Sequence, residues 1–167
     1  MNEFGGVEDA LRKWLKNAGR IIVVGIGNEL RRDDFVGVEI VRGLKGKVSK
    51  HVMLIESETV PESFIEPITK FNPTHVLLID AGLLGLKAGD TKFVESSKAF
   101  GSSTTAISTH ALPLKIFCEY LEKTVGAKIT LIIMQPKITD FGEGLSIEVG
   151  KAAKKLKKIL LKVLSSS

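Results

Sequence analysis

Residues 76–80 read Val-Leu-Leu-Ile-Asp, a short apolar run that ends in a carboxylate, and this stretch decides the fold. Two more unbroken apolar runs occupy residues 21–24 and 131–134. Runs of this kind are typical of parallel strands that helices cover on both faces. Residues 52–55 and 92–95 resemble further strands, the second at an edge because charged residues interrupt its apolar character.

Helical segments are predicted around these runs, at residues 6–17, 36–44, 61–70, 112–124 and from 146 onward. The alternation of strand and helix implies right-handed crossovers. We therefore expect an α/β protein with a three-layer α/β/α architecture and a mainly parallel, twisted sheet of about five strands.

The chain has 167 residues, the usual size of one domain that buries a full core. We expect a single domain over 1–167, with an N-terminal helix in 1–19, an α/β core in 20–164 and a disordered tail in 165–167. A hydrophobic fraction of 44% beside 26% charged residues is globular. No apolar run approaches the roughly 18 residues that span a bilayer, and no secretory signal is evident. These features predict a soluble, cytoplasmic protein without membrane insertion.

The net charge of +5 comes from one terminal segment. Residues 146–167 contain six of the 24 basic residues and one of the 19 acidic residues, so the rest of the chain is neutral. The lysines alternate with apolar residues at helical spacing, which is typical of the solvated face of an amphipathic helix. This segment contains no aromatic residue for base stacking. We therefore expect no nucleic-acid partner.

Covalent catalysis by a side-chain nucleophile finds little support. The single cysteine, Cys118, excludes an internal disulfide and fits a reducing compartment. It lies at helical spacing with Leu114, Phe117 and Leu121, so we expect a buried small hydrophobe rather than a nucleophile. The Gly-x-Ser-x-Gly motif of serine hydrolases and the His-Glu-x-x-His motif of metalloproteases are both absent.

Three polar residues, Asp34, Asp80 and His110, lie where predicted strands give way to loops or helices. In an open α/β sheet the loops after the C-terminal strand ends share one crevice, where ligands bind. A carboxylate that ends a buried strand, as Asp80 does, is costly unless it is hydrogen-bonded, paired or bound to a metal. Two carboxylates and an imidazole suit nickel, zinc, iron or manganese, and three protein ligands leave coordination positions open. The sequence therefore predicts a metal site formed by these three residues.

Each of these residues also has a purely structural interpretation. A hydrogen-bonding role explains Asp80, and a helix cap or a surface position explains His110. One of the adjacent Asp33 and Asp34 is expected to cap the helix that follows, because a carboxylate accepts hydrogen bonds from the first N–H groups of a helix. We assign Asp33 to capping or support and Asp34 to the site, although spacing alone does not distinguish them.

Two glycines after the first strand, Gly25 and Gly27, suggest a dinucleotide-binding motif whose N–H groups hold a pyrophosphate. Leu30 stands where that motif has its third glycine, and the chain has no Gly-Lys-Ser/Thr of a P-loop. A tight turn explains the two glycines better. A nucleotide-binding α/β module nevertheless stays as an alternative function.

The sequence also predicts the structure of the segment before His110 and the positions of the other two histidines. Residues 96–109 are rich in Ser, Thr and Gly and are expected to be irregular, as a lid, a substrate-binding loop or a disordered segment. His51 and His75 precede their strands, so both are expected at the opposite, N-terminal edge of the sheet. The histidines are therefore predicted to divide between the two edges.

A set of short motifs runs in order from about residue 20 to residue 160. They are Gly25-Ile26-Gly27-Asn28, Asp33-Asp34 with Gly37, Pro61-Glu62, Leu78-Ile79-Asp80-Ala81, Ser108-Thr109-His110, Leu112-Pro113-Leu114 and Gln135-Pro136. In this order they resemble the hydrogenase maturation endopeptidases, which process the large subunit of nickel-iron hydrogenases. Two segments depart from the family pattern, because residues 56–59 replace a glycine-rich turn and Ala88-Gly89 replaces Pro-Gly.

The resemblance implies a phosphorylase/hydrolase-like fold and a metal-dependent endopeptidase. In the family the positions of Asp34, Asp80 and His110 contact the metal, so the resemblance implies that they form both the catalytic and the metal site. The implied substrate is a nickel-iron hydrogenase large-subunit precursor, which loses a C-terminal extension after nickel insertion. The resemblance thus implies that nickel comes with the bound precursor, and we expect other divalent metals to substitute for it.

Two mechanisms stay open at this stage. Nickel either polarises the scissile carbonyl and activates water, or it serves as a docking point while the carboxylates supply a general base. A non-catalytic nickel carrier with the same three residues is a further alternative function. We expect the protein to act as a monomer.

Overall fold

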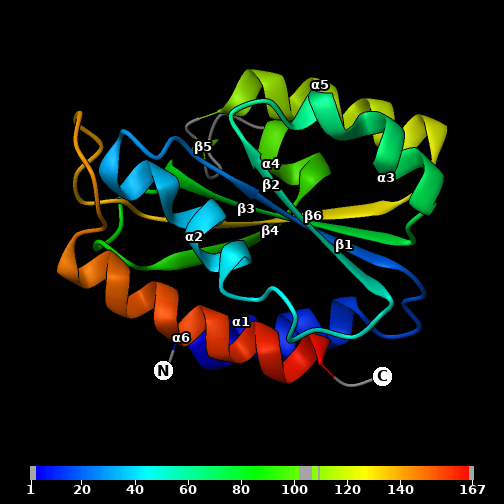
Figure 1. Ribbon diagram of the computed structural model, residues 1–167, viewed down its shortest axis with the longest axis horizontal. Helices are drawn as coiled ribbons and strands as arrows, with labels where there is room; N and C mark the ends of the chain where they lie inside the picture. Colours follow the sequence, from blue (N-terminus) through cyan, green and yellow to red (C-terminus); the bar gives the residue numbers. More distant parts are fainter. Residues whose placement is uncertain (1–2, 102–106, 109, 166–167) are drawn as a thin grey trace.

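The computed structural model describes residues 3–101, 107–108 and 110–165 (Figure 1). The strands are β1 (Ile21–Ile26), β2 (Val52–Glu58), β3 (His75–Leu83), β4 (Thr91–Glu95), β5 (Ile107–Ser108) and β6 (Lys128–Met134). The helices are α1 (Glu3–Trp14), α2 (Val36–Arg42), α3 (Ile65–Phe71), α4 (Ser96–Gly101), α5 (Ala111–Thr124) and α6 (Ile147–Leu164). Two 3-10 turns, η1 (Arg32–Phe35) and η2 (Pro61–Phe64), precede α2 and α3.

The central sheet has the strand order β2-β1-β3-β6-β4. The first four strands of this order run parallel, and β4 runs antiparallel to β6. The edge position of β4 was predicted from its charged residues, but its direction was not. The short β5 pairs antiparallel with the C-terminal end of β3. Figure 1 shows α1, α2 and α6 on one face of the sheet and α3, α4 and α5 on the other. The predicted three-layer α/β/α fold with a mainly parallel sheet is confirmed.

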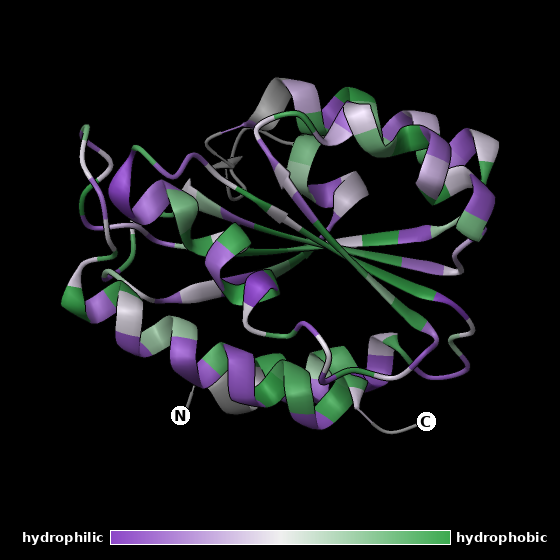
Figure 2. Cartoon of the chain, in the orientation of Figure 1, coloured by the Kyte–Doolittle hydropathy of each residue, from purple (hydrophilic) through white to green (hydrophobic). Residues whose placement is uncertain are grey.

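Alternate residues of the central strands serve the two helical layers. On β3, Leu77 and Ile79 pack against the layer of α1, α2 and α6, whereas Val76 and Leu78 pack against the layer of α3 and α5. All four side chains are buried. This two-sided burial explains why the strands are continuous apolar runs rather than alternating ones, and Figure 2 shows their hydrophobic centres.

The lysine-rich helix α6 packs by its apolar face. Leu156 and Leu160 are fully buried in the cluster shared with α1 and α2, while Lys154 and Lys158 are exposed. The excess of positive charge therefore lies on the outer face of a packed helix, as its spacing predicted. No helix within the described ranges is both long enough and apolar enough to cross a membrane.

The N-terminal helix lies three residues earlier than predicted at each end. It ends at Trp14 because the chain turns at Asn17, whose φ of 67° is left-handed and incompatible with a continuing helix. Val7 and Leu11 of α1 are buried in the same cluster as α6. At the other terminus Ser165 follows α6, and residues 166–167 of the predicted tail lie outside the described residues. The division of the chain into domains stays a prediction.

The prediction of an irregular segment at residues 96–109 was wrong for the parts that the structure describes. Ser96–Gly101 forms α4, and Ile107–Ser108 forms β5. Residues 102–106 and 109 lie outside the described residues. The composition suggested a loop, but burial of Ala99 in the second core cluster favours the helix, because tertiary packing overrides weak local propensity.

The strand order places two chain exits side by side. β1 and β3 are neighbours at the centre of the sheet and run parallel, so their C-terminal ends open at the same edge. The chain leaves β1 through η1 into α2 and reaches β2, which lies on the side of β1 away from β3. The carboxyl edge beside such a divergence of the chain is the usual position of ligands in open α/β sheets.

Candidate metal centre

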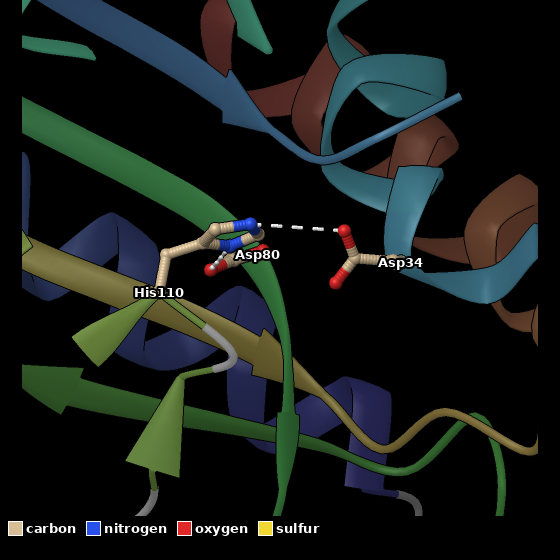
Figure 3. A group of neighbouring side chains, drawn as sticks. All are labelled: Asp34, Asp80 and His110. Carbon is tan, nitrogen blue, oxygen red and sulfur yellow. Dashed lines mark hydrogen bonds and ion pairs between the residues drawn. The ribbon is translucent and has the colours of Figure 1, made fainter. Parts of the chain in front are cut away.

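Three side chains meet at the carboxyl edge of the sheet (Figure 3): Asp34 from η1, Asp80 from β3, and His110 from the residue before α5. One ligand atom of each lies within 4.8 Å of the other two. His110 Nδ1 is 3.0 Å from Asp80 Oδ2, and His110 Nε2 is 3.7 Å from Asp34 Oδ2. The structure thus brings together the three residues that the sequence singled out, while their metal-binding and catalytic roles stay predictions.

Backbone N–H groups orient both carboxylates. Asp80 is fully buried, and its Oδ1 accepts a hydrogen bond of 2.8 Å from the N–H of Ala81. Asp34 is 5% exposed, and its Oδ2 accepts a hydrogen bond of 3.0 Å from the N–H of Asn28. Since these donors belong to the backbone, the carboxylate oxygens keep fixed directions towards the imidazole.

Two glycines let η1 approach the strand ends. A Cβ atom at Gly27 would overlap the backbone oxygen of Asp34, and one at Gly37 would overlap the carbonyl oxygen of Ile79. The backbone around Asp34 is therefore packed directly on the strand that carries Asp80. Glycine is needed because any side chain would push the two carboxylates apart.

The same packing argues against the nucleotide-binding alternative. A pyrophosphate would have to approach the backbone after β1, but the chain of η1 already covers Gly27. The N–H of Asn28 is bonded to the Asp34 carboxylate instead of pointing freely into the crevice. A phosphate would also meet two carboxylates of its own charge.

The two carboxylates control the charge of His110. Burial of the ring acts to lower its pKa, but the hydrogen bond with Asp80 and the negative charges of Asp80 and Asp34 outweigh burial and raise the pKa above the ordinary value. The site therefore favours a positive charge between the carboxylates. A divalent cation supplies the same charge balance with more positive charge in one place.

The donor set fits a divalent transition metal. Two carboxylate oxygens are hard ligands and the imidazole nitrogen is a borderline one, a mixed set that suits nickel, zinc, iron or manganese. Around an ion bound at about 2.1 Å, neighbouring ligand atoms lie about 3 to 3.5 Å apart. The separations of up to 4.8 Å therefore require only small side-chain movements. Asp80 can bind the ion directly or orient His110 through Nδ1, as carboxylates commonly do for metal-binding histidines.

The other histidines lie where the sequence placed them, at the opposite edge. His75 is the first residue of β3 and pairs with Ile21 and Lys128, the first residues of their strands. His51 is exposed in the turn before β2. Neither takes part in the cluster of Asp34, Asp80 and His110.

Cys118 is the buried hydrophobe that its spacing predicted. The side chain is 1% exposed in the cluster with Leu114, Phe117 and Leu121. Burial, reinforced by nearby Glu122 and Glu119, raises the pKa of its thiol to about 12. A thiol with this pKa is not a nucleophile near neutral pH.

The expectation that one of the paired aspartates caps α2 was wrong. The N-cap of α2 is Phe35, and no side chain caps that helix. Asp33 instead accepts hydrogen bonds from a segment more than 100 residues later, at Lys137, Ile138 and Ser146. Its assignment to support was right, but its partners are distant in sequence. Local spacing carries no information about such partners.

Sequence reasoning gave no role to two further residues near the site. Gln135 follows β6, and its Oε1 accepts a hydrogen bond of 2.7 Å from the N–H of Leu84, which fixes the chain after β3. Glu58 ends β2 with a φ of 53°, the conformation that a glycine-rich turn would favour at this place. Its carbonyl accepts the N–H of Gly27. Gly89, at the second departure from the family pattern, has a left-handed φ of 93°, which glycine adopts without strain.

Fold and site together define a class: a three-layer α/β protein with a carboxylate–imidazole cluster at the carboxyl edge of a parallel sheet. The family model for hydrogenase maturation proteases, HycI, matches residues 38–163, a range that contains Asp80 and His110 and begins just after Asp34. The chain belongs to the hydrogenase maturation protease family, and it is therefore a protease, a hydrolase of peptide bonds.

Individual relatives agree with this assignment. A Methanocaldococcus jannaschii protein assigned to the hydrogenase maturation proteases is 34% identical over 166 residues, covering 95% of this chain and 96% of the relative. The Escherichia coli hydrogenase 3 maturation protease is 26% identical over 120 residues, covering 72% and 75%. The crystal structure of the nickel-iron hydrogenase maturation protease HycI from Thermococcus kodakarensis superimposes with a TM-score of 0.85 at 31% identity, covering 94% of this chain and 99% of that one.

Proposed function

We propose that this protease removes a C-terminal extension from the precursor of a nickel-iron hydrogenase large subunit, and that it recognises nickel already held by that precursor. The observation that supports this is the cluster of Asp34, Asp80 and His110, whose ligand atoms lie within 4.8 Å of one another. Three protein donors do not complete the coordination of a transition metal. In this proposal the precursor supplies the nickel and its remaining ligands.

Incomplete coordination gives the reaction its selectivity. The three residues add their donor atoms to the substrate's nickel, and this places the peptide bond next to the metal at the carboxyl edge of the sheet. His110 must lose its shared proton before it binds nickel, because only neutral imidazole is a ligand. A precursor without nickel offers no cation to replace that proton, so it is held weakly.

Hydrolysis then requires a polarised carbonyl and an activated water. Nickel in the substrate would supply the Lewis acid, and a carboxylate oxygen that does not coordinate it would supply the general base. Asp34 is the better candidate for the base, because Asp80 is already paired with His110 Nδ1 at 3.0 Å. Asp34→Asn tests this division, since it should lower kcat much more than it raises KM.

The decisive experiment compares nickel-loaded and nickel-free precursor. We expect wild-type protein to shorten only the nickel-loaded form, as read by mass spectrometry of the product. The variants Asp34→Ala, Asp80→Ala and His110→Ala should each slow processing by about 100-fold or more. His51→Ala, on the opposite edge, is the matched control and should process normally.

Two results would contradict the proposal in different ways. Equal processing of nickel-loaded and nickel-free precursor would remove the role of nickel while leaving the protease activity intact. Binding of nickel-loaded precursor without any change in its mass would favour the non-catalytic carrier.

A further inference from the structure

Asp33 is a fully buried carboxylate that four donors surround. Its Oδ2 accepts hydrogen bonds from the N–H groups of Lys137 and Ile138, both at 2.9 Å, and from Ser146 Oγ at 2.8 Å. Its Oδ1 accepts a bond of 2.7 Å from the N–H of Ser146. A buried carboxylate is costly without such partners, so these four bonds compensate for the burial of Asp33.

These bonds connect η1 with the chain on both sides of the loop between β6 and α6. Lys137 and Ile138 lie shortly after β6, whereas Ser146 is the N-cap residue of α6. Backbone bonds join the same two regions, because the N–H of Arg32 donates to the carbonyl of Gly142 at 3.1 Å. The N–H of Asp33 itself donates to the carbonyl of Ile138 at 3.0 Å. The Asp33 side chain is thus the central tie between two segments that are distant in sequence.

The segment held by this tie cannot fix its own shape. η1 has only four residues and no side-chain cap, and isolated turns of this length are unstable. Arg32, directly before Asp33, has a left-handed φ of 48°, which is unfavourable for a residue with a side chain. An external restraint is therefore needed to keep η1 in place, and Asp33 provides it in the middle of the turn.

The residue next to Asp33 is Asp34, which belongs to the candidate metal centre. Asp33 points into the segment 137–146, while Asp34 points towards His110 (Figure 3), with its Oδ2 3.7 Å from His110 Nε2. A binding or catalytic group must be held within about 0.5 Å of its working position. Since one peptide unit separates the two aspartates, a shift of Asp33 moves Asp34 directly.

We infer that Asp33 is a positioning residue that acts on the reaction through Asp34, by fixing η1 to the segment 137–146. This inference rests on the proposed function, because it assumes that the place of Asp34 matters to metal binding and hydrolysis. In this inference Asp33 acts through Asp34 and not on the substrate, because all four of its side-chain bonds go to residues of the 137–146 segment.

A double-mutant cycle on nickel(II) binding to the protein alone tests the inference. Asp33→Asn replaces one acceptor oxygen by an NH2 group that faces N–H donors, and it should weaken nickel affinity about tenfold or more, as changes behind a metal ligand do. In an Asp34→Ala background the same change should alter affinity less than about twofold, because the residue through which it acts is gone. An equal loss in both backgrounds would overturn the inference.

A milder variant protects the test against misfolding. Ser146→Ala removes one of the four bonds and leaves the three backbone donors, and it should show the same pattern with a smaller loss. Asp140→Asn is the matched control, because it removes an exposed carboxylate from the same loop, and it should change nothing. Loss of thermal stability with unchanged nickel affinity in both Asp33→Asn and Ser146→Ala would assign Asp33 to stability alone.

The kinetics of precursor cleavage show whether this inference or the proposed function is wrong. Asp33→Asn should lower kcat at least tenfold and raise KM for the nickel-loaded precursor by a smaller factor, because Asp34 both contacts nickel and serves as a reacting group. If wild-type protein cleaves nickel-loaded and nickel-free precursor equally, or binds no nickel alone, the kcat effect still decides the role of Asp33. A raised KM at unchanged kcat, or unchanged values of both, would overturn it.

Discussion

At the carboxyl edge of the sheet His110 lies between two carboxylates, whereas at the amino edge His75 lies against an indole ring and near an ammonium group. The rings of His75 and Trp14 meet edge to face, with centroids 4.9 Å apart. Burial and the charge of Lys128 lower the pKa of His75, while Asp80 and Asp34 raise that of His110. The comparison teaches that a buried histidine becomes a candidate for chemistry through its charged neighbours and not through burial itself.

Alanine at each histidine should separate activity from stability, and this is the largest contrast that we expect. His110→Ala should lower precursor processing by about 100-fold or more, because it removes the nitrogen ligand, and should destabilise the fold by only about 1 kcal/mol, because the ring is partly exposed. His75→Ala should retain processing but destabilise the fold by about 2 kcal/mol, because it leaves a cavity beside Trp14. Processing rates and urea unfolding of both variants measure the contrast.

The opposite pattern would break the comparison. Normal processing by His110→Ala would show that the carboxyl edge is not the reactive one. Loss of processing by His75→Ala at a temperature where the variant is fully folded would move the search for the site to the amino edge.

Glycines at the two edges should differ in a similar way. Gly37→Ala should destabilise the protein by about 3 kcal/mol, or roughly 6 to 12 °C in Tm, because its Cβ would overlap backbone oxygens of β1 and β3. Gly126, which precedes β6 at the amino edge, has a left-handed φ of 71°, and a Cβ atom there would meet no other group within 4 Å. Gly126→Ala should therefore cost only about 1 kcal/mol.

Precursor processing should also differ between the two glycine variants. Because Gly37 lets η1 reach the strand that carries Asp80, Gly37→Ala should also lower processing at temperatures where the protein stays folded. Gly126→Ala should process at the wild-type rate. Calorimetry and a processing assay at about 25 °C separate the two effects, and equal stability losses at the two positions would contradict the steric argument.

Much of the fold followed from the sequence because the strands are buried on both faces. Continuous runs such as residues 76–79 have few alternatives, and the parallel order then placed the residues after β1 and β3 at one edge. The meeting of Asp34 and Asp80 followed from that order. The position of His110 followed only from the family motifs, because the preceding strand β4 is antiparallel and ends at the other edge. Sequence reasoning succeeded where a residue's position depends on the strand that it follows.

It failed where a residue's position depends on distant partners. One of the paired aspartates was expected to cap the next helix, yet neither does, and all four donors of Asp33, which was assigned to capping or support, lie in residues 137–146. The segment 96–101 was expected to be irregular, yet Ala99 packs into the core and the segment is helical. Such contacts between distant residues produce no periodic pattern in the sequence, so only the folded structure shows them.

The smallest effect that we expect is on the pH dependence of the free energy of unfolding. His110 at the carboxyl edge and His75 at the amino edge should affect it in different pH ranges. The pKa of His110 is raised in the fold, so its contribution to stability is fully present below the unfolded value of about 6.5 and is lost as pH rises through the raised value. The pKa of His75 is lowered, so the unfolded chain takes up the proton first. Its contribution is present above about 6.5 and is lost as pH falls through the window below that value. The free energy of unfolding should therefore rise with pH below about 6.5, because of His75, and fall with pH above about 6.5, because of His110.

Glutamine variants assign each slope to one histidine. His110→Gln should flatten the dependence on the alkaline side of about 6.5, and His75→Gln should flatten it on the acid side. Urea unfolding at a series of pH values gives the slopes, and NMR titration of the ring protons should place His110 above His75. If both rings titrate at the same pH, the carboxylates do not hold His110 in its charged form, and the electrostatic difference between the two edges disappears.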